Sequence, residues 1–252
     1  MMGSRDEILG RLRRALAKPS LEHHHGHQPE IADIRELFAS DFIHDSLVDR
    51  FKKEFELVSG EATVCTSIEA AFKSVRQLVL SSGFGKVAVS KHDLCRRLKL
   101  LERLPVELPE VQFISETIDS ENAFERERLT ERLSEVQLSI TGVEYLIADT
   151  GTLVTIANPQ ASRQISLLPT AHLALAKAKQ IYPNMAELFL QIQEKYGDNL
   201  PGSALTLITG PSRTADIEKV LIKGVHGPTR LFAILLDCPL PDTPDTNEAP
   251  PQ

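Results

Sequence analysis

The sequence contains no tryptophan, and aromatic residues make up only 5% of its 252 residues. A surface on which nucleic-acid bases stack needs clustered aromatic side chains, which this composition does not offer. The net charge of −7 at pH 7 points the same way, because binding of phosphate groups needs clustered lysine and arginine. The composition therefore argues against a nucleic-acid-binding protein.

Cysteine is also scarce: Cys65, Cys95 and Cys238 are far apart and form no Cys-x-x-Cys pair. Zinc and iron–sulfur sites use such pairs, so neither is expected in this chain. We interpret the three thiols as small buried side chains. Residues 83–86 (Gly-Phe-Gly-Lys) lack the spacing of a phosphate loop, and no Gly-x-Gly-x-x-Gly is present, so no nucleotide cofactor is expected.

Long apolar runs are missing as well. No run approaches the length of a membrane span, and the first seven residues lack the apolar core of a signal peptide. We therefore expect a cytoplasmic protein without a membrane span. Hydrophobic residues account for 42% and charged residues for 25% of the chain, which suffices for one substantial folded domain.

The two ends of the chain differ from its middle. Residues 5–17 place apolar side chains at helical spacing opposite arginines, which predicts an N-terminal helical arm. The arm is too short and too mixed in charge to favour a membrane-surface helix, so packing on its own or a partner subunit is preferred. Residues 23–27 (His-His-His-Gly-His) follow. They resemble a flexible linker more than a metal site, because such a run has no fixed geometry. Residues 239–252 are rich in proline and predict a disordered tail.

These features predict an arm and linker over 1–43, one α/β domain over 44–238 and a tail over 239–252. Within the domain, short apolar runs alternate with helical patterns, which indicates a mostly parallel sheet flanked by helices. Helices are expected at 44–57, 67–82, 92–103, 121–136 and 170–181, and strands at 62–65, 86–90, 111–114, 152–157, 163–168, 204–209 and 230–237.

The most informative stretch lies between residues 149 and 172. Residues 152–157 and 163–168 both resemble strands and are separated by Asn-Pro-Gln, which predicts a β-hairpin over 152–168. The open end of this hairpin would bring Asp149, Thr150, Gly151 and Thr152 beside Thr170 and His172. We expect Asp149 to keep the His172 imidazole protonated there, so that the site suits a small carboxylate. Structural roles in turns and caps are the alternative for each residue alone.

Two further motifs follow a strand pattern near the C-terminus. Ser212, Arg213 and Thr214 precede a helix predicted to begin near Asp216, where free N–H groups could bind an anion; in the alternative, the acidic residues of the first turn already satisfy that helix end. Residues 223–228 (Lys-Gly-Val-His-Gly-Pro) are expected to end that helix. His226 would cap the carbonyls of the turn, which is the favoured interpretation, or act as a general base or ligand donor. If strands 204–209 and 230–236 are parallel, these two loops lie at opposite sheet edges, and His226 and Ser212 share a site only across a subunit interface or if one strand runs antiparallel.

Four motifs in one order resemble the lactate utilization protein C family, which is built around the LUD domain: ADTGTLV, SLLPTAH, GPSRTADIE and KGVHGP. The resemblance covers roughly the C-terminal half. It implies a fold similar to the sugar-phosphate isomerase and CoA-transferase superfamily. It also implies a role in the oxidation of L-lactate to pyruvate beside partner proteins that carry iron–sulfur clusters.

Three functions remain open at this point. The favoured one is an accessory or ligand-binding subunit of a lactate-oxidising system, because no redox group is evident in this chain. The second is a free-standing enzyme of the isomerase or acyl-transfer type acting on a small anion, for which Glu144 and Asp149 are the nearby carboxylates. The third is a pure interaction module. The sequence leaves open whether the protein is catalytic.

Overall fold

The computed structural model of the protein describes residues 46–115, 123–158, 162–197, 199–214, 222–223 and 227–239. The predicted N-terminal arm, the histidine-rich linker and the proline-rich tail lie outside these residues, as do Asp216 and His226.

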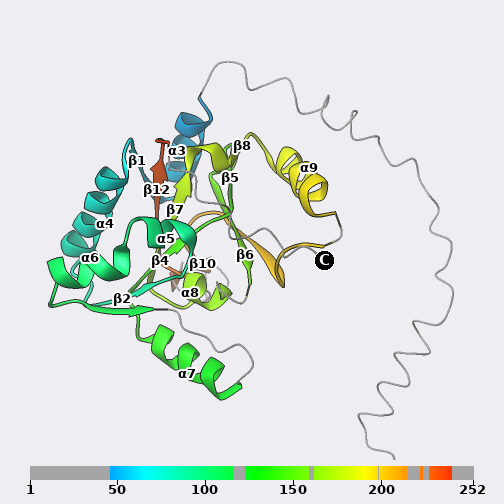
Figure 1. Ribbon diagram of the computed structural model, residues 1–252. Coiled ribbons are helices and arrows are strands. Elements are labelled where there is room, and N and C mark those ends of the chain that lie inside the picture. Colours follow the sequence, from blue (N-terminus) through cyan, green and yellow to red (C-terminus); the bar gives the residue numbers. More distant parts are fainter. Residues whose placement is uncertain are drawn as a thin grey trace, which may run out of the picture. The chain divides into compact units, whose positions relative to one another are not determined.

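The centre of the fold is a six-stranded sheet in which all neighbouring strands run parallel, in the order β1-β12-β7-β4-β2-β3 (Figure 1). The predicted fold class, an α/β domain with a mostly parallel sheet, is therefore confirmed. The strands are β1 (Gly60–Cys65), β2 (Lys86–Val89), β3 (Gln112–Ser115), β4 (Leu138–Gly142), β7 (Ala171–Lys177) and β12 (Arg230–Leu236).

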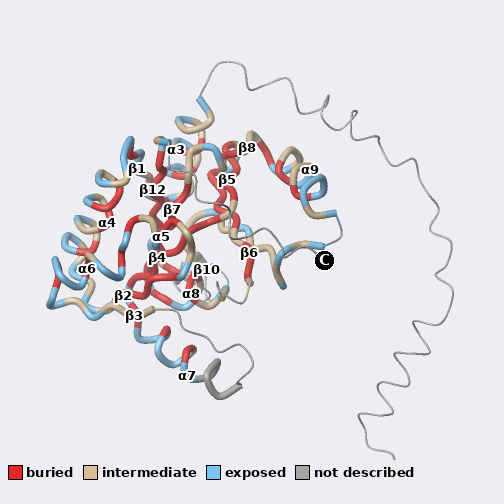
Figure 2. Tube along the Cα trace, in the orientation of Figure 1, coloured by how far each residue is buried: buried red, intermediate tan, exposed pale blue. Residues whose placement is uncertain are grey.

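Helices pack on both faces of this sheet, so the central strands are buried while the helices expose their outer sides (Figure 2). One face carries α4 (Ile68–Ser82), α5 (Asp93–Arg97) and α6 (Leu100–Glu107), whose apolar side chains join a single core with alternate residues of the strands. The other face packs on α3 (Leu47–Leu57) and on a second sheet. Because both faces are covered, the inner strands are apolar almost throughout.

The second sheet has the order β8-β5-β6-β9 and is mostly antiparallel. Its strands are β5 (Tyr145–Ile147), β6 (Thr152–Ala157), β8 (Ile181–Tyr182) and β9 (Ala204–Ile208). Helix α9 (Met185–Tyr196) packs against it through the core that contains Leu188 and Ile192. The remaining elements are α7 (Ala123–Ser134), α8 (Arg163–Leu167), the short 3-10 turn Ala178–Gln180, and the two-residue strands β10 (Arg213–Thr214) and β11 (Ile222–Lys223).

Local sequence explains α4 well. Ser67 caps its start by accepting a hydrogen bond from the N–H of Ala70 at 3.1 Å, and Gly83 ends it in the left-handed conformation with φ of 66°. The predicted helix over 92–103 is instead two helices, because Lys99 adopts a left-handed conformation between α5 and α6. The second of them continues through Pro105, beyond the predicted end at residue 103, and packs Leu104 against the core.

Two predictions for the middle of the chain are wrong. Residues 163–167 form the helix α8 and not a strand, because Ser162 accepts a hydrogen bond from the Gln164 N–H at 3.1 Å and caps a helical turn. The predicted helix over 170–181 is instead the central strand β7, whose alanines and leucines are buried between two neighbours. The predicted hairpin over 152–168 therefore does not form: β6 pairs with β5 and β9.

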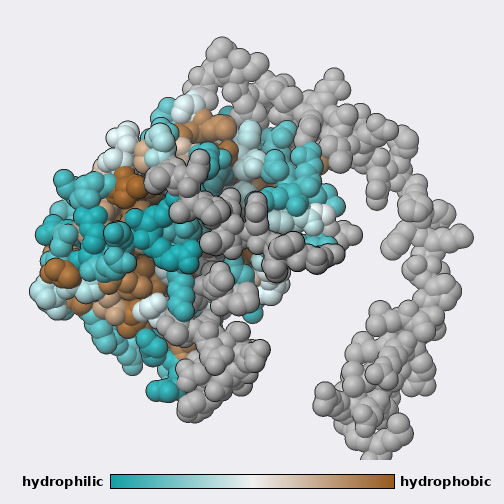
Figure 3. All heavy atoms as spheres, viewed as in Figure 1, coloured by the Kyte–Doolittle hydropathy of each residue, from teal (hydrophilic) through white to brown (hydrophobic). Residues whose placement is uncertain are grey.

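In the described part of the chain, no helix is both long and apolar enough to cross a bilayer. Exposed hydrophobic side chains on α4 and α6 (Leu80, Leu101 and Val106) lie among charged ones, and the space-filling view shows mixed hydrophilic and hydrophobic areas (Figure 3).

Candidate functional site

The carboxyl ends of β7, β4 and β2 lie side by side in the main sheet, and in parallel α/β sheets ligands bind at that edge. The chain places Lys177 at the end of β7, Glu144 two residues after β4 and His92 three residues after β2. All three line one cavity of about 340 Å³, which is near the lower end of the range for small-molecule sites. The other residues that line it are Asp93, Tyr145, Lys179, Gln180, Tyr182, Lys195 and Tyr196.

Glu144 lies on the short link that carries the chain from β4 in the main sheet to β5 in the second sheet. One of its carboxyl oxygens, Oε2, accepts a hydrogen bond from the backbone N–H of Ile156 at 2.9 Å. Burial raises the pKa of this carboxyl to about 7, although the hydrogen bond from Ile156 opposes the shift. Near neutral pH the group therefore exchanges a proton readily, as a general acid or base must.

His92 faces the same cavity in a fixed ring state. Its Nδ1 accepts a hydrogen bond from the backbone N–H of Leu94 at 3.2 Å, which caps α5 and leaves the ring proton on Nε2. Burial lowers the pKa of His92 to about 4, so the imidazole is neutral at pH 7. The ring lies directly over Gly142, where a Cβ atom would overlap it. Only glycine at the end of β4 allows this approach.

The cavity is rich in cationic side chains. Lys177, Lys179 and Lys195 line it, and Asp93 is the acidic residue beside them other than Glu144. Asp93 is engaged by Arg97, whose Nε lies 2.5 Å from its Oδ2. The local charge therefore favours an anionic ligand.

Gln180 fixes the geometry of this edge. Its side-chain oxygen accepts a hydrogen bond from the Lys177 N–H at 2.6 Å, and its amide nitrogen donates to the carbonyls of Val143 and Glu144, both at 2.8 Å. One side chain thus ties the end of β7 to the link that carries Glu144. Such a rigid support is what a binding site requires.

A second, small cavity of about 20 Å³ adjoins the first and shares Glu144 with it. This volume is about that of a single water molecule. Its polar lining includes Ser90, Thr141, Thr155 and Ser166. Glu144 therefore stands between a space for a ligand and a space for one water molecule.

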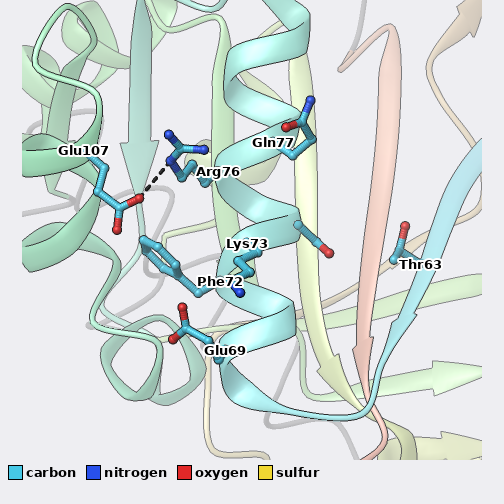
Figure 4. A pocket seen from close by; sticks show the side chains of 8 residues that line it. Thr63, Glu69, Phe72, Lys73, Arg76, Gln77 and Glu107 are labelled. Carbon is cyan, nitrogen blue, oxygen red and sulfur yellow. Dashed lines mark ion pairs between the residues drawn. The ribbon is translucent and has the colours of Figure 1, made fainter.

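A larger open groove of about 630 Å³ is lined by residues of α4, among them Lys73 and Arg76, and Arg76 is directed toward Glu107 of α6 (Figure 4). Its charges are largely paired with one another: Nε of Arg76 lies 2.8 Å from Glu107, and Arg103 forms two hydrogen bonds with Glu69. The groove is also on the outer side of a helix, away from the strand ends. We therefore favour the cavity beside Glu144.

The structure separates the residues of the site predicted from the sequence. Asp149, Thr150 and Gly151 form the turn between β5 and β6, where the Asp149 N–H donates to the Pro183 carbonyl at 3.1 Å. Burial raises the pKa of Asp149, while the nearby Thr150 hydroxyl and Arg50 charge lower it. The hydroxyl of Thr152 lies 2.8 Å from those of both Thr150 and Thr209.

His172 has a different neighbour from the predicted one. It is the second residue of β7, is fully buried, and its Nε2 lies 2.8 Å from the hydroxyl of Thr141 on β4. Burial lowers the pKa of His172 to about 4, and no charged group contributes to this shift. The expectation that Asp149 keeps this imidazole protonated is therefore wrong, because the ring is placed inside the core.

The described parts of the two C-terminal loops do meet, because the parallel pairing that would separate them does not occur. Strand β9 belongs to the second sheet and β12 to the main one, and the Ser212 N–H donates to the Pro228 carbonyl at 2.8 Å. Thr170 lies beside them, since its carbonyl accepts from the Thr229 N–H at 2.8 Å. Arg213 and Thr214 form β10, which pairs with β11, so residues 222–223 are a strand and not the predicted helix.

Thr170 and Lys177 mark opposite ends of β7, separated by roughly 20 Å at the usual rise per residue of a strand. Thr170 and Ser212 therefore lie at the amino edge of the main sheet, while the cavity beside Glu144 lies at the carboxyl edge. From the sequence, Glu144 is a candidate only as a nucleophile, and His92, Lys177 and Gln180 are not among the predicted site residues. Their shared position after the ends of β2, β4 and β7 is the signal that could have identified them.

No three histidine, cysteine, aspartate or glutamate side chains among the described residues are grouped as they would be around a metal ion. Cys65 and Cys95 are buried and Cys238 is partly buried. Burial raises the pKa of the Cys95 thiol to about 12.

A protein-family model described as the LUD domain matches residues 48–236. Lactate utilization protein C of Exiguobacterium sp. is 28% identical to this chain over 92% of the chain and 96% of that protein. The protein of that name in Bacillus subtilis is 27% identical, over 90% of the chain and 91% of the relative. The protein of that name in Halalkalibacterium halodurans is 36% identical over 45% of the chain, and this match spans only 50% of the relative.

The fold is similar to that of a DUF162 family protein from Deinococcus radiodurans, with a TM-score of 0.52 over 78% of this chain and 99% of that one. The two sequences are only 17% identical, so this likeness concerns the fold alone. The family model covers most of the chain, including β4, the Glu144 link and β7. The chain belongs to the LUD domain family.

Proposed function

We propose that this protein is a component of a lactate utilization system and binds a small carboxylate in the cavity beside Glu144. Membership of the LUD domain family and the names of the relatives in Exiguobacterium and Bacillus subtilis support the pathway. The observation that carries the site is the group of three lysines around one cavity at the carboxyl edge of the parallel sheet.

In this proposal the protein acts in the cytoplasm as an accessory or ligand-binding subunit. The electrons of lactate pass to partner proteins with iron–sulfur clusters, and this chain contributes no redox cofactor. Lactate or pyruvate binds with its carboxylate toward the lysines, and Lys177 contributes most because it lies at the rigid end of β7 beside Gln180. The test in cells is growth on L-lactate, which deletion of this gene should abolish or slow.

The site itself is tested by calorimetric titration of the full-length protein with L-lactate and pyruvate. Lys177→Met should weaken binding about tenfold or more, because one charge-assisted hydrogen bond contributes on the order of 1.5–3 kcal/mol. Lys73→Met is the matched control, since Lys73 lies on the open groove along α4. Asp149→Asn tests the site first predicted from the sequence. If this variant and not Lys177→Met lost binding, the ligand would belong to the turn between β5 and β6.

A second candidate function is that of an enzyme acting on a small anion. The raised pKa of Glu144 favours it, because proton transfer at neutral pH needs a group of this kind.

A further inference from the structure

Resting on the proposed binding of a small carboxylate, we propose that the same cavity catalyses enolisation of a 2-oxo acid. In this reaction Glu144 is the base that removes a proton from C3, and the Nε2–H of His92 donates a hydrogen bond to the C2 carbonyl oxygen.

The first support is the placement of the carboxyl. Glu144 lines the ligand cavity and is held there on two sides: Oε2 accepts from the Ile156 N–H at 2.9 Å, and its backbone carbonyl accepts from Gln180 at 2.8 Å. The carboxyl is thus anchored to the backbone through Oε2. A base fixed at the wall of a cavity is what proton abstraction requires.

The second support is the ring state of His92. Because Nδ1 accepts the Leu94 N–H, the neutral ring carries its proton on Nε2, and a ring packed over Gly142 has little freedom to turn. A neutral imidazole donates a hydrogen bond to a carbonyl oxygen without giving up its proton fully. A carboxylate base paired with a neutral histidine donor is the arrangement that triosephosphate isomerase, a standard example, uses for enolisation.

The third support is the charge around the two groups. An oxo acid has a carboxylate on the carbon next to its carbonyl, and Lys177, Lys179 and Lys195 provide cations for that carboxylate. The negative charge that develops on the enolate oxygen is stabilised by the same cations and by the His92 donor. A carboxylate held at the lysines would direct the remainder of the molecule into the cavity.

The step balances without any further reactant. The C3–H bond breaks and its proton forms an O–H bond with the Glu144 carboxylate. The electron pair becomes the C2–C3 double bond, and the carbonyl electrons move to the oxygen that His92 binds. Reversal returns a proton to C3. The neighbouring cavity of about 20 Å³, with room for one water molecule, gives the Glu144 proton a route for exchange with solvent.

Solvent deuterium exchange tests this inference. Full-length protein is incubated with pyruvate in deuterated phosphate buffer, and loss of the methyl signal is followed by proton NMR, while pyruvate affinity is measured by calorimetry. We expect the wild-type protein to accelerate exchange well above the buffer rate. Glu144→Gln should reduce the protein-dependent rate by a factor of about 10²–10⁴, the usual contribution of a general base, with affinity changed less than about threefold.

His92→Asn is the second variant, because asparagine can still cap α5 while the imidazole donor is lost. It should slow exchange by about 10²-fold, as removal of a donor to a developing oxyanion does. Glu61→Gln, on an exposed part of β1, is the control carboxylate and should leave the rate unchanged. Glu144→Asp keeps the acid but shortens it. It should slow exchange at least tenfold, and it replaces Glu144→Gln if the latter does not fold.

The outcomes separate the two proposals. Binding of pyruvate without exchange above the buffer rate overturns the catalytic inference and leaves the binding function intact. Exchange that survives in both Glu144→Gln and His92→Asn also overturns it. Exchange lost in these variants and kept in Glu61→Gln supports it. Absence of both binding and exchange refutes the binding function together with the inference.

Discussion

The hydroxyl oxygen of Thr141 lies 2.8 Å from Nε2 of His172, and both side chains are buried. The two residues belong to the neighbouring parallel strands β4 and β7, on the face where Ala174 and Ala176 join the core formed with α3 and the second sheet. The contact joins a buried imidazole to the wall of the small cavity beside Glu144, since Thr141 also lines that cavity.

Replacement of Thr141 by valine should destabilise the protein by about 1–3 kcal/mol, because the buried Nε2 of His172 loses its partner at nearly constant side-chain volume. Urea unfolding measures this change. Thr63→Val, at an exposed position of β1, should shift the free energy of unfolding by less than about 0.5 kcal/mol. Equal effects of the two substitutions would show that the Thr141–His172 contact contributes nothing to stability.

Gly142→Ala should disturb the candidate site. A Cβ at this position overlaps the His92 ring, so the imidazole must move away from its place over β4. We expect a loss of about 1–3 kcal/mol in unfolding free energy, as for other overpacked sites, together with at least tenfold weaker pyruvate binding. Thermal unfolding and calorimetry provide the two readouts.

Gly85→Ala is the control for that substitution, because the nearest atom to its added Cβ is the Gln137 side-chain oxygen at 3.6 Å, an ordinary contact. It should bind pyruvate like the wild type. Unchanged affinity in Gly142→Ala would instead place the ligand away from His92.

Gly151→Ala tests the turn between β5 and β6. Gly151 has φ of 59°, and its added Cβ would lie 2.6 Å from the Glu54 carbonyl carbon and from Phe55 Cα in α3, and closer still to the Phe55 nitrogen. Gly83 is also in the left-handed conformation, with φ of 66°, and has nothing within 4 Å of the added atom. Gly83→Ala should therefore cost about 1–2 kcal/mol from backbone strain alone, and Gly151→Ala about 3 kcal/mol or more. Chemical denaturation compares them, and similar losses would argue against close packing of the turn on α3.

Glu144→Gln should change how stability depends on pH. The pKa of Glu144 is raised from 4.5 to about 7 on folding, so between these values the native state binds more protons than the unfolded state. The stabilising contribution of the protonated carboxyl is complete below pH 4.5 and is lost as pH rises through 7. This loss is at most about 3 kcal/mol. The unfolding free energy of the variant minus that of the wild type should therefore rise with pH over this window and then level off.

In the wild type and in Glu144→Gln alike, His92 and His172 make the unfolding free energy depend on pH in the opposite direction. Their pKa values fall from 6.5 to about 4 on folding, so each destabilises the fold as pH drops below 6.5. The difference between wild type and Glu144→Gln removes this shared contribution. A flat difference curve between pH 4.5 and 8 would mean that Glu144 titrates normally.

Local sequence determined several helices and strands. The helix α4 follows from apolar spacing between Ser67, which caps it, and Gly83, which ends it in a conformation that glycine adopts readily. The strands β2 and β12 follow from short apolar runs bounded by breakers, and their alternation with helices indicates a parallel sheet. These signals lie within a few residues of the element they specify, so the sequence alone suffices to predict them.

Tertiary contacts decided the secondary structure of residues in the middle of the chain. Residues 171–177 contain alanine and leucine, which favour helices, yet they form the central strand because β4 and β12 bond to both of its edges. Residues 163–167 alternate in hydrophobicity like a strand, but the segment is too short for this pattern to distinguish a strand from a helix. The hydrogen bond that Ser162 accepts at the start of the segment stabilises a helix. Because both of these segments are predicted wrongly from the sequence, His172 is expected at the mouth of a hairpin. In the structure it lies in the core.

The sequence by itself determined the α/β class and, through its four motifs, the family. It did not determine the cavity beside Glu144, because His92, Glu144 and Lys177 are separated by more than 30 residues at each step and share no local pattern. Only the strand order β7-β4-β2 brings their ends together. That order is fixed by hydrogen bonding and burial between distant segments, and the raised pKa of Glu144 likewise arises from burial that only the folded chain creates.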